Sequence, residues 1–556
     1  MKKFKISTIA LITLILVFSC KDQLDVKNPN QPTAGSINTE NNITALGLGV
    51  YASGFRGLKY GGFQGTFATD VMSFHEIMGD VIGVEAANLY INQLGMPDWV
   101  KLDNNSTVNN PSTPNTQLAL IRLTNQNSYA DQNPIYYEWA YMYALNNACN
   151  GILANVDIIT DYKGDVATKK NALKAWAYWW KGYAYSRIGS MYYAGVINND
   201  VGKIVNNYVS HDGIIAESNA NFDNAIAALN AITATGVVAD YNTILKAMIP
   251  SFFQVGVGQA PSIAQFIRNI NTMKARNLLI NKRFSAMTAG DWNNILTLTN
   301  SGIQSTDNIF KALSNATSDF MSASGGCVAL IAASDPSTGT YKISERLMSD
   351  FLYRPGDKRY TNNFSNSVTG GKWLGNSDRG NIFNTRYKLL NNTTGVGPAG
   401  AGVIVLANKT AGSGEFFIAG TYEENELMKA EAKANTGDLA GATASVQNVI
   451  NFQGGGVTVT TFPDLATANK EIRIERRVGL AFKGLAFYDA RRYGYLDPVS
   501  SGGGRSGVTV VDKTGLVNTN AQINFNYLDY WDVCDNEIVF NTPSGTSAPT
   551  KNPRVN

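Results

Sequence analysis

The chain has 556 residues, with 46 basic side chains, 43 acidic side chains and two histidines. Residues 1–19 hold three lysines and no acid, so without them 43 basic side chains balance 43 acidic ones. A neutral body lacks the electrostatic footprint of a nucleic-acid-binding protein, so no nucleic acid is expected as a partner. The four cysteines form no Cys-x-x-Cys pair, and two histidines are too few for a multi-histidine site, so no metal and no cofactor are predicted.

The N-terminus is typical of an exported lipoprotein. Three lysines precede an apolar run over 6–18, which suits a signal peptide and is too short to span a bilayer. The run ends at Ser19-Cys20, which resembles the bacterial lipobox, where the cysteine becomes the diacylated first residue. We expect a signal peptide over 1–19, acylation of Cys20, and a lipidated N-terminus and tether over 20–40. Ordinary cleavage, with Cys20 as a free thiol, is the alternative.

Apolar periodicity at helical spacing begins near residue 41 and then predicts three pairs of helices. The pairs cover 137–159 with 171–193, 271–286 with 291–302, and 422–435 with 439–453. A long helix over about 469–493 follows. Cys149 falls within the first helical pattern and is predicted to be a core residue.

The second and third pairs share a Gly-Asp joint. Gly290-Asp291 and Gly437-Asp438 each place a glycine where one helix ends and an aspartate where the next begins. Glycine adopts the left-handed conformation that closes a helix, and the aspartate oxygen caps the following one. These joints resemble degenerate tetratricopeptide helix-turn-helix units, with unrelated αα-hairpins as the alternative.

Two loop-rich insertions interrupt the helices, over about 63–130 and 305–420. Short strands over 403–406 and 415–419 are expected to form a hairpin in the second insertion. The chain beyond the last helix is predicted to be irregular. The predicted fold is therefore mainly α: a tetratricopeptide-like helical-repeat scaffold with a long irregular ligand-binding half and a few short strands, in a single domain over 41–556.

Several motifs, in this order, resemble the SusD/RagB family of outer-membrane nutrient-binding lipoproteins. They are an aromatic run over 173–189, G-D-W at 290–292, D-x-R at 357–359, E-L-x-x-A-E-A at 426–432, and E-R-R…L-A-F…D-x-R-R-x-G over 475–494. The resemblance implies a tetratricopeptide scaffold and a lipid anchor in the outer membrane, facing the cell exterior. It also implies a SusC-like TonB-dependent transporter as partner, and oligosaccharides or, in some members, peptides as ligands.

Sugars are bound by flat aromatic faces that cover their C–H patches and by Asn, Asp and Arg side chains that take their hydroxyls. Trp99 and Trp373 lie beside glycine in polar loops and are the predicted platforms. The segment 67–99 matches where family members build part of their ligand site. Its further candidates are Asp70, Phe74, His75, Tyr90 and Asn92, and Arg379 is a candidate for a hydroxyl. The alternatives are packing for Phe74 and Tyr90, and a solvated charge for Arg379.

Other tryptophans lie on periodic helices and are predicted to pack in the core. These are Trp139, Trp176, Trp179, Trp180 and Trp292.

The sequence thus predicts a cell-surface glycan-binding lipoprotein that captures an oligosaccharide or polysaccharide and delivers it to a TonB-dependent transporter. No catalytic residue is predicted. A peptide-binding subunit of the same kind of complex is one alternative. A surface glycoside hydrolase is another, because Asp70 with Glu76 or Asp80 could supply the two carboxyl groups that such enzymes use.

Overall fold

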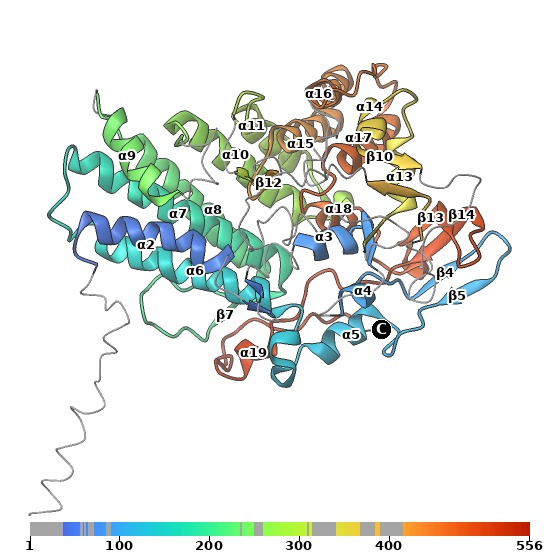
Figure 1. Cartoon of the computed structure of the whole chain (residues 1–556), viewed down its shortest axis with the longest axis horizontal. Helices are drawn as coiled ribbons and strands as arrows, with labels where there is room; N and C mark the ends of the chain where they lie inside the picture. Colours follow the sequence, from blue (N-terminus) through green and yellow to red (C-terminus); the bar gives the residue numbers. More distant parts are fainter. Residues whose placement is uncertain are drawn as a thin grey trace, which may run out of the picture.

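The computed structural model describes eleven stretches of the chain, and all structural statements concern these. They are residues 37–55, 59–60, 63–64, 72–84, 90–233, 236–249, 259–307, 311–313, 341–366, 384–389 and 415–555. Helices dominate (Figure 1), which confirms the predicted mainly helical fold. They form two groups, and a small β-rich edge lies beside the second group.

The first group is a bundle around one long buried helix, on the left of Figure 1. Its members are α2 (Glu40–Phe55), α6 (Tyr136–Asn155), α7 (Val166–Met191), α8 (His211–Asn230) and α9 (Val238–Met248). Helix α7 contacts each of the other four. Trp176, Trp179 and Trp180 on α7 are fully buried, and so is Cys149 on α6, as predicted. The predicted pair α6–α7 is confirmed, whereas α8 and α9 were not predicted.

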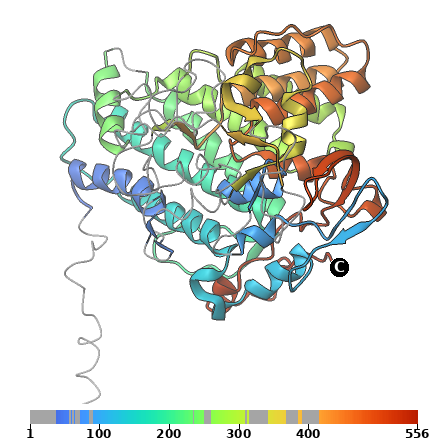
Figure 2. The same cartoon turned by 45° about the vertical axis from the view of Figure 1, so that its right-hand side comes forward.

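The second group lies at the top of Figure 1 and comes forward in Figure 2. It consists of α10 (Ile263–Ile280), α11 (Ala289–Asn300), α15 (Tyr422–Asn435), α16 (Leu439–Phe452), α17 (Leu465–Gly479) and α18 (Ala486–Arg492). Contacts run from α10 to α11, from α11 to α15 and from α15 to both α16 and α17. Trp292 on α11 packs here with Ala275, Leu279, Ile295, Met428 and Ala432. The two predicted pairs therefore stack on each other although the chain between them is long.

The two joints differ. At Gly437 the φ angle is +93°, and Asp438 accepts a hydrogen bond from the Gly441 amide at 2.8 Å, as predicted. Gly290, in contrast, lies inside the first turn of α11, so its predicted role as a helix stop is wrong. Thr288 begins that helix instead: its side chain accepts from the Asp291 amide while Asp291 accepts from the Thr288 amide.

The long helix predicted over 469–493 is also wrong, because it is broken into α17 and α18. Between them Phe482 adopts φ +62° and Gly484 φ +70°. A left-handed phenylalanine is uncommon, and here its ring is 9% exposed and belongs to the main core. Tertiary packing thus overrides the helical periodicity at this point.

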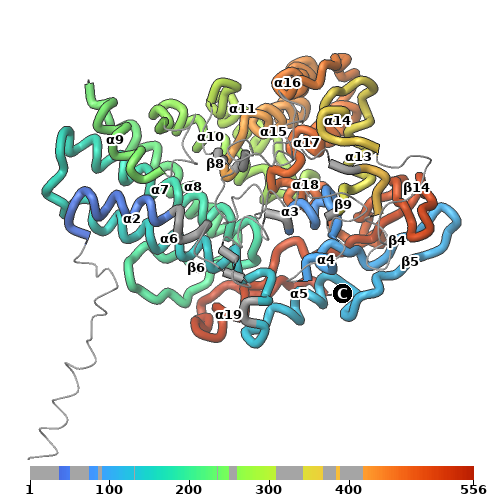
Figure 3. Tube along the Cα trace, in the orientation of Figure 1, coloured from blue at the N-terminus to red at the C-terminus, as the bar shows by residue number. Residues whose placement is uncertain are grey.

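The largest sheet is antiparallel and has the order β13-β14-β4-β5. Its strands are β13 (Arg505–Val511), β14 (Val517–Asn524), β4 (Trp99–Lys101) and β5 (Thr107–Asn109). Figure 3 shows its two hairpins, from distant parts of the sequence, side by side at the right. The C-terminal hairpin β13–β14 was predicted to be irregular, and that prediction is wrong.

Five two-stranded ladders complete the β structure. They are β1 (Lys59–Tyr60) with β2 (Phe63–Gln64), β3 (Ile82–Val84) with β9 (Tyr341–Ile343), β6 (Ala194–Val196) with β7 (Tyr208–Ser210), β8 (Lys311–Leu313) with β12 (Glu415–Phe417), and β10 (Phe364–Asn366) with β11 (Tyr387–Leu389). The strand predicted over 415–419 is therefore β12, but it pairs with β8. Residues 403–406, its predicted partner, lie outside the described residues.

Short helices fill the connections. They are α3 (Met72–Met78), α4 (Ile91–Leu94), α5 (Gln117–Thr124), α13 (Glu345–Phe351), α14 (Lys358–Asn363) and α19 (Asp535–Ile538), with 3-10 turns η3 (Asn127–Gln132), η5 (Phe284–Ala286) and η8 (Val499–Ser501).

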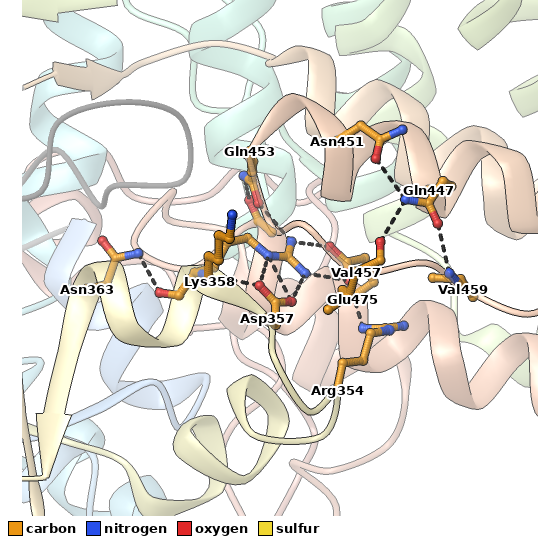
Figure 4. Close-up of polar contacts among 12 residues, drawn as sticks. Arg354, Asp357, Lys358, Asn363, Gln447, Asn451, Gln453, Val457, Val459 and Glu475 are labelled. Carbon is orange, nitrogen blue, oxygen red and sulfur yellow. Dashed lines mark hydrogen bonds and ion pairs between the residues drawn. The ribbon is translucent and has the colours of Figure 1, made fainter.

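A buried arginine ties α14 to α16 and α17. Arg359 donates to Asp357 at 2.6 Å, to Glu475 at 3.1 Å and to Gln453 at 3.0 Å. Arg354 donates to the same Glu475 carboxylate at 2.9 Å from the opposite side. Figure 4 shows these acceptors converging from separate segments. The D-x-R element and the first residue of E-R-R are thus structural.

A second buried network joins α15, α17 and α18. Arg492 donates to both oxygens of Glu431, at 2.7 and 2.6 Å, and to Asp489 at 2.8 Å. Arg476 donates to the other oxygen of Asp489 at 2.8 Å. Removing one partner of such a buried pair typically costs about 3–5 kcal/mol, since the other charge is left uncompensated. The D-x-R-R stretch at 489–492 therefore holds α15, α17 and α18 together.

Candidate functional site in the segment 90–101

The segment 90–101 combines partly exposed aromatic rings with a rigid backbone. Ile91, Leu94 and Met96 are buried and anchor it to the core. Gln117 donates to the Leu94 carbonyl at 2.9 Å, and the Tyr527 hydroxyl donates to the Gly95 carbonyl. The segment thus has fixed geometry although glycine and proline interrupt it.

Trp99 was predicted to lie in a loop, and the structure corrects this. It begins strand β4, opposite Asn109 of β5 and Asn524 of β14. Its side chain is only partly buried. A ring fixed on a central strand loses less conformational freedom on binding than a ring on a loose loop.

Asp98, next to this tryptophan, was not predicted as a site residue. Its Oδ2 accepts from the Asn526 side-chain amide at 2.7 Å, while its Oδ1 has no hydrogen-bond partner among the described residues. Burial raises the pKa of Asp98 to about 6, against the lowering influence of Asn526 and Arg554. A carboxylate oxygen without a partner is a suitable acceptor for a sugar hydroxyl, although this oxygen is buried in the fold as it stands. The signal in the sequence was its place directly before the predicted platform.

Tyr90 and Asn92 lie at the start of the segment. Tyr90 precedes α4 with φ +57°, and its partly exposed ring lies 6.3 Å from that of Tyr129, centroid to centroid. Asn92 is only 9% exposed. Neighbouring Gln93 keeps a buried Oε1 without a hydrogen-bond partner among the described residues. The structure therefore leaves the Tyr90 ring partly exposed beside that of Tyr129, whereas Asn92 is buried.

Phe74 and His75 do not reach this surface, and their prediction as ligand residues is corrected. Both side chains are fully buried, because α3 packs them into the core. The Phe74 ring meets Trp531 edge-on at 6.1 Å. His75 Nε2 lies 3.1 Å from Arg187 and 3.6 Å from Glu138. Burial, followed by the positive charge of Arg187, lowers the pKa of His75 to about 4, so it is neutral at pH 7.

Of the three carboxylates considered for a hydrolase, the two that the structure describes, Glu76 and Asp80, are buried in the same region. Glu76 accepts from the Phe482 and Gly484 amides at 3.1 and 2.6 Å. Burial raises its pKa to about 7. Burial acts in the same direction on Asp80, but Arg346, at 2.6 Å, and other arginines outweigh it and hold the pKa at about 2. Both carboxylates fasten segments of the fold and neither is exposed to a substrate.

Four predicted residues, Cys20, Asp70, Trp373 and Arg379, lie outside the described residues. Their roles stay predictions. Within the described stretches, no helix is long and apolar enough to cross a membrane. In that same part of the chain, no group of three or more His, Cys, Asp and Glu side chains is placed to hold a metal ion.

The fold resembles that of several solved structures. A SusD-like carbohydrate binding protein from Bacteroides vulgatus is 13% identical, with 92% of this chain and 98% of that chain covered and a TM-score of 0.54. A SusD superfamily protein from the same organism is 12% identical, over 82% and 88% of the chains, with a TM-score of 0.53. A SusD-like protein from Bacteroides fragilis is 14% identical, over 92% and 96%, with a TM-score of 0.52.

In sequence, no family model and no curated protein matches this chain. At identities this low, the similarity over nearly whole chains establishes the fold. Function has to be inferred from the residues of the site. It confirms, at the level of the fold, the resemblance that the sequence motifs indicated. The chain has the fold of the SusD-like proteins.

Proposed function

We propose that the protein is a cell-surface lipoprotein that captures an oligosaccharide or polysaccharide and delivers it to a SusC-like TonB-dependent transporter in the outer membrane. The fold supports this proposal, because one of its structural relatives is a SusD-like carbohydrate binding protein. The proposed chemistry is binding without catalysis, since the aromatic segment offers contact surface and hydrogen-bond acceptors rather than a reactive group.

The observation that carries the proposal is the partly exposed Trp99 on a fixed strand, with the half-paired carboxylate of Asp98 directly before it in the chain. An indole face covers the flat C–H patch of a pyranose or furanose ring, and a carboxylate oxygen accepts hydrogen bonds from neighbouring hydroxyls. Tyr90 and Tyr129 offer a second pair of partly exposed aromatic rings in the same insertion. Trp373 and Arg379 are proposed as additional contacts.

Calorimetric titration of the purified protein with oligosaccharides of several classes tests the proposal, beside a mixture of short peptides. The variants are Trp99→Ala and Asp98→Asn, and the control is Phe540→Ala, which removes an aromatic ring that is 80% exposed and far along the chain. We expect a saccharide to bind the parent and the control equally. Each site variant should weaken its affinity about 5- to 100-fold, the range of one lost binding hot spot. If only peptides bind, the protein is a peptide-binding subunit and the glycan hypothesis is wrong. If both variants bind the saccharide as tightly as the parent, the segment 90–101 is not the binding site.

The delivery step rests on the resemblance and on the proposed anchor at Cys20. We expect the acylated protein to copurify with a TonB-dependent transporter after mild detergent extraction of the outer membrane. Extraction that yields the lipoprotein alone, under conditions that keep other membrane complexes intact, would remove the transporter from the proposal.

A further inference from the structure

A partly open cavity of about 560 Å³ lies between α17 and α18 and is bordered by Arg505 of β13 and Asp350 of α13. None of the residues that line it belongs to the segment 90–101. Cavities of ~300–1,000 Å³ are the usual size for small organic ligands. The cavity is therefore large enough for a separate ligand site.

The lining of this cavity is strongly cationic. Its basic side chains are Lys470, Arg473, Arg476, Arg477 and Arg505. Among the described residues that line the cavity, only two carboxylates, those of Asp350 and Asp489, oppose these five cations. The lining therefore has a net charge of +3. The ion-paired residues behind it are two acids, Asp80 and Glu431, and two arginines, Arg346 and Arg492, so they leave this net charge unchanged.

Both carboxylates already have strong partners. Asp350 accepts from Arg477 at 2.5 Å. Asp489 accepts from Arg476 and from an arginine behind the lining, each at 2.8 Å. Burial alone would raise the pKa of Asp489, but these two guanidinium groups outweigh it and lower that pKa, so the carboxylate stays charged. Since Arg505 Nε lies 3.3 Å from Asp80, the excess positive charge belongs mainly to Lys470 and Arg473.

Three guanidinium nitrogens of the lining are buried and make no hydrogen bond to any described residue. They are Nη1 of Arg476, Nε of Arg473 and Nε of Arg505, the last of which lies 3.3 Å from Asp80 Oδ2 in an ion pair. Arg476 is only 2% exposed. Lys470 and Arg473 form no ion pair within the described part of the chain; Arg473 instead stacks over Tyr493, 4.3 Å from its ring centroid. A buried donor without an acceptor costs about 1–3 kcal/mol, more when it is charged, and a bound anion would recover that energy.

The helix that supplies four of these cations separates its charges by face. The positions 466, 469, 470, 473, 474 and 477 of α17 line the cavity and are adjacent on one side at helical spacing. Arg476 lines it as well, and Leu480 and Ala481 continue the lining just beyond the end of the helix. The acids of the same helix, Glu471 and Glu475, do not line it; they accept from Arg354. Figure 4 shows Glu475 turned toward that arginine and Asp357. The cations thus face the cavity without the acids of their own helix.

Apolar side chains complete the walls. Val81, Ile474, Leu480 and Leu485 contribute aliphatic surface, and Tyr495 presents a ring beside the Arg505 guanidinium at 4.6 Å. An inorganic ion would leave this apolar surface unused. A ligand with both an anionic group and a carbon skeleton would use the whole lining.

We propose that this cavity binds a small organic acid, of monosaccharide to disaccharide size, whose carboxylate, sulfate or phosphate group meets the Arg473–Arg476 side and whose apolar face meets the aliphatic wall. The site is independent of the proposed glycan-capturing role. Failure of the segment 90–101 to bind a neutral glycan would leave it untouched.

Calorimetric titration of the full protein, purified in detergent, tests the proposal with four probes: glucuronate, glucose, inorganic sulfate and inorganic phosphate. The variant is Lys470→Gln with Arg473→Gln, because both side chains lie at the rim and neither carries a buried ion pair of the scaffold. The control is Lys203→Gln, which removes an amine that is 65% exposed. Melting temperatures of the three proteins show that each remains folded.

We expect at least one anionic probe to bind the parent and the control at least tenfold more tightly than glucose, and the variant to lose at least tenfold in affinity. Binding in 1 M NaCl should weaken as well, since salt screens charges near the rim. Glucuronate binding would assign a carboxylate ligand, and sulfate or phosphate binding alone would assign an ester of that anion. Equal binding by parent and variant, or no preference for any anion over glucose, would overturn the proposal.

Discussion

Replacing Trp179 by alanine should unfold part of the scaffold without touching the ligand surface, whereas Trp99→Ala should do the reverse. Trp179 is fully buried in α7, stacks on Tyr183 at 5.7 Å and donates its indole N–H to Asn269 at 2.9 Å. Truncating a buried tryptophan costs about 3–5 kcal/mol through lost transfer energy and the cavity left behind. The Asn269 oxygen would also lose its donor, which adds about 1–3 kcal/mol.

Truncation of Trp99 costs less stability, because its side chain is only partly buried. Its removal should cost about 1–3 kcal/mol of binding energy and little stability. Thermal melts and calorimetric titrations on the two alanine variants separate these outcomes. If Trp179→Ala melts like the parent, the buried aromatic cluster is not the core of the bundle. If Trp99→Ala binds the cognate saccharide normally, the segment 90–101 is not the site.

Three further perturbations test the fold and the anchor. Gly437→Val should lower the free energy of unfolding by about 1–2 kcal/mol, since φ is +93° there. Gly290→Val, inside a helix, should not lower it. Equal melting temperatures for the two variants would contradict this expectation. Burial raises the pKa of Glu76 in the folded state to about 7, from an unfolded value near 4.5. Between these two pH values the folded chain holds a proton that the unfolded chain has lost. The free energy of unfolding should therefore fall by about 3 kcal/mol between pH 4.5 and 7 and then level off. Denaturant unfolding at pH 5 and 8 should show a smaller fall for Glu76→Gln, and an identical fall would refute the assignment. Cys20→Ala should release the protein from the outer-membrane fraction, and unchanged membrane association would exclude the lipid anchor.

The sequence could predict the helices whose apolar spacing agrees with their final packing. Helix α15 begins and ends where predicted, and Gly437 has the expected conformation, because both depend on neighbours within a few residues. Gly290 misled the prediction, since Thr288 two residues earlier already caps the helix. The break at Phe482 depends on tertiary packing, which periodicity does not reveal.

The site was harder to predict because its partners are far apart in the sequence. Trp99 is held in its strand by Asn109, ten positions away, and by Asn524, more than 400 positions away. The hairpin that supplies this partner has a local signal that was missed: Val508 and Val510 alternate with polar residues before the turn that contains Gly515, where φ is +86°. His75 looked like a binding residue by composition, but only the packing of α3 reveals that it is buried.

The same spacing argument explains why one short stretch of sequence carries two roles. In α17, Glu471 and Glu475 are one turn apart and point to the arginines of the α13–α14 connection, where desolvated ion pairs fix the scaffold. Arg473 and Arg477 are also one turn apart, but the helix turns them to the cavity on another side. A motif read only as letters suggests a single block of alternating charge. In a helix with 3.6 residues per turn, these residues lie on two faces. The acids form one face, where ion pairs neutralise their charge and stabilise the fold. The cations form the other face, where the described residues neutralise their charge only in part.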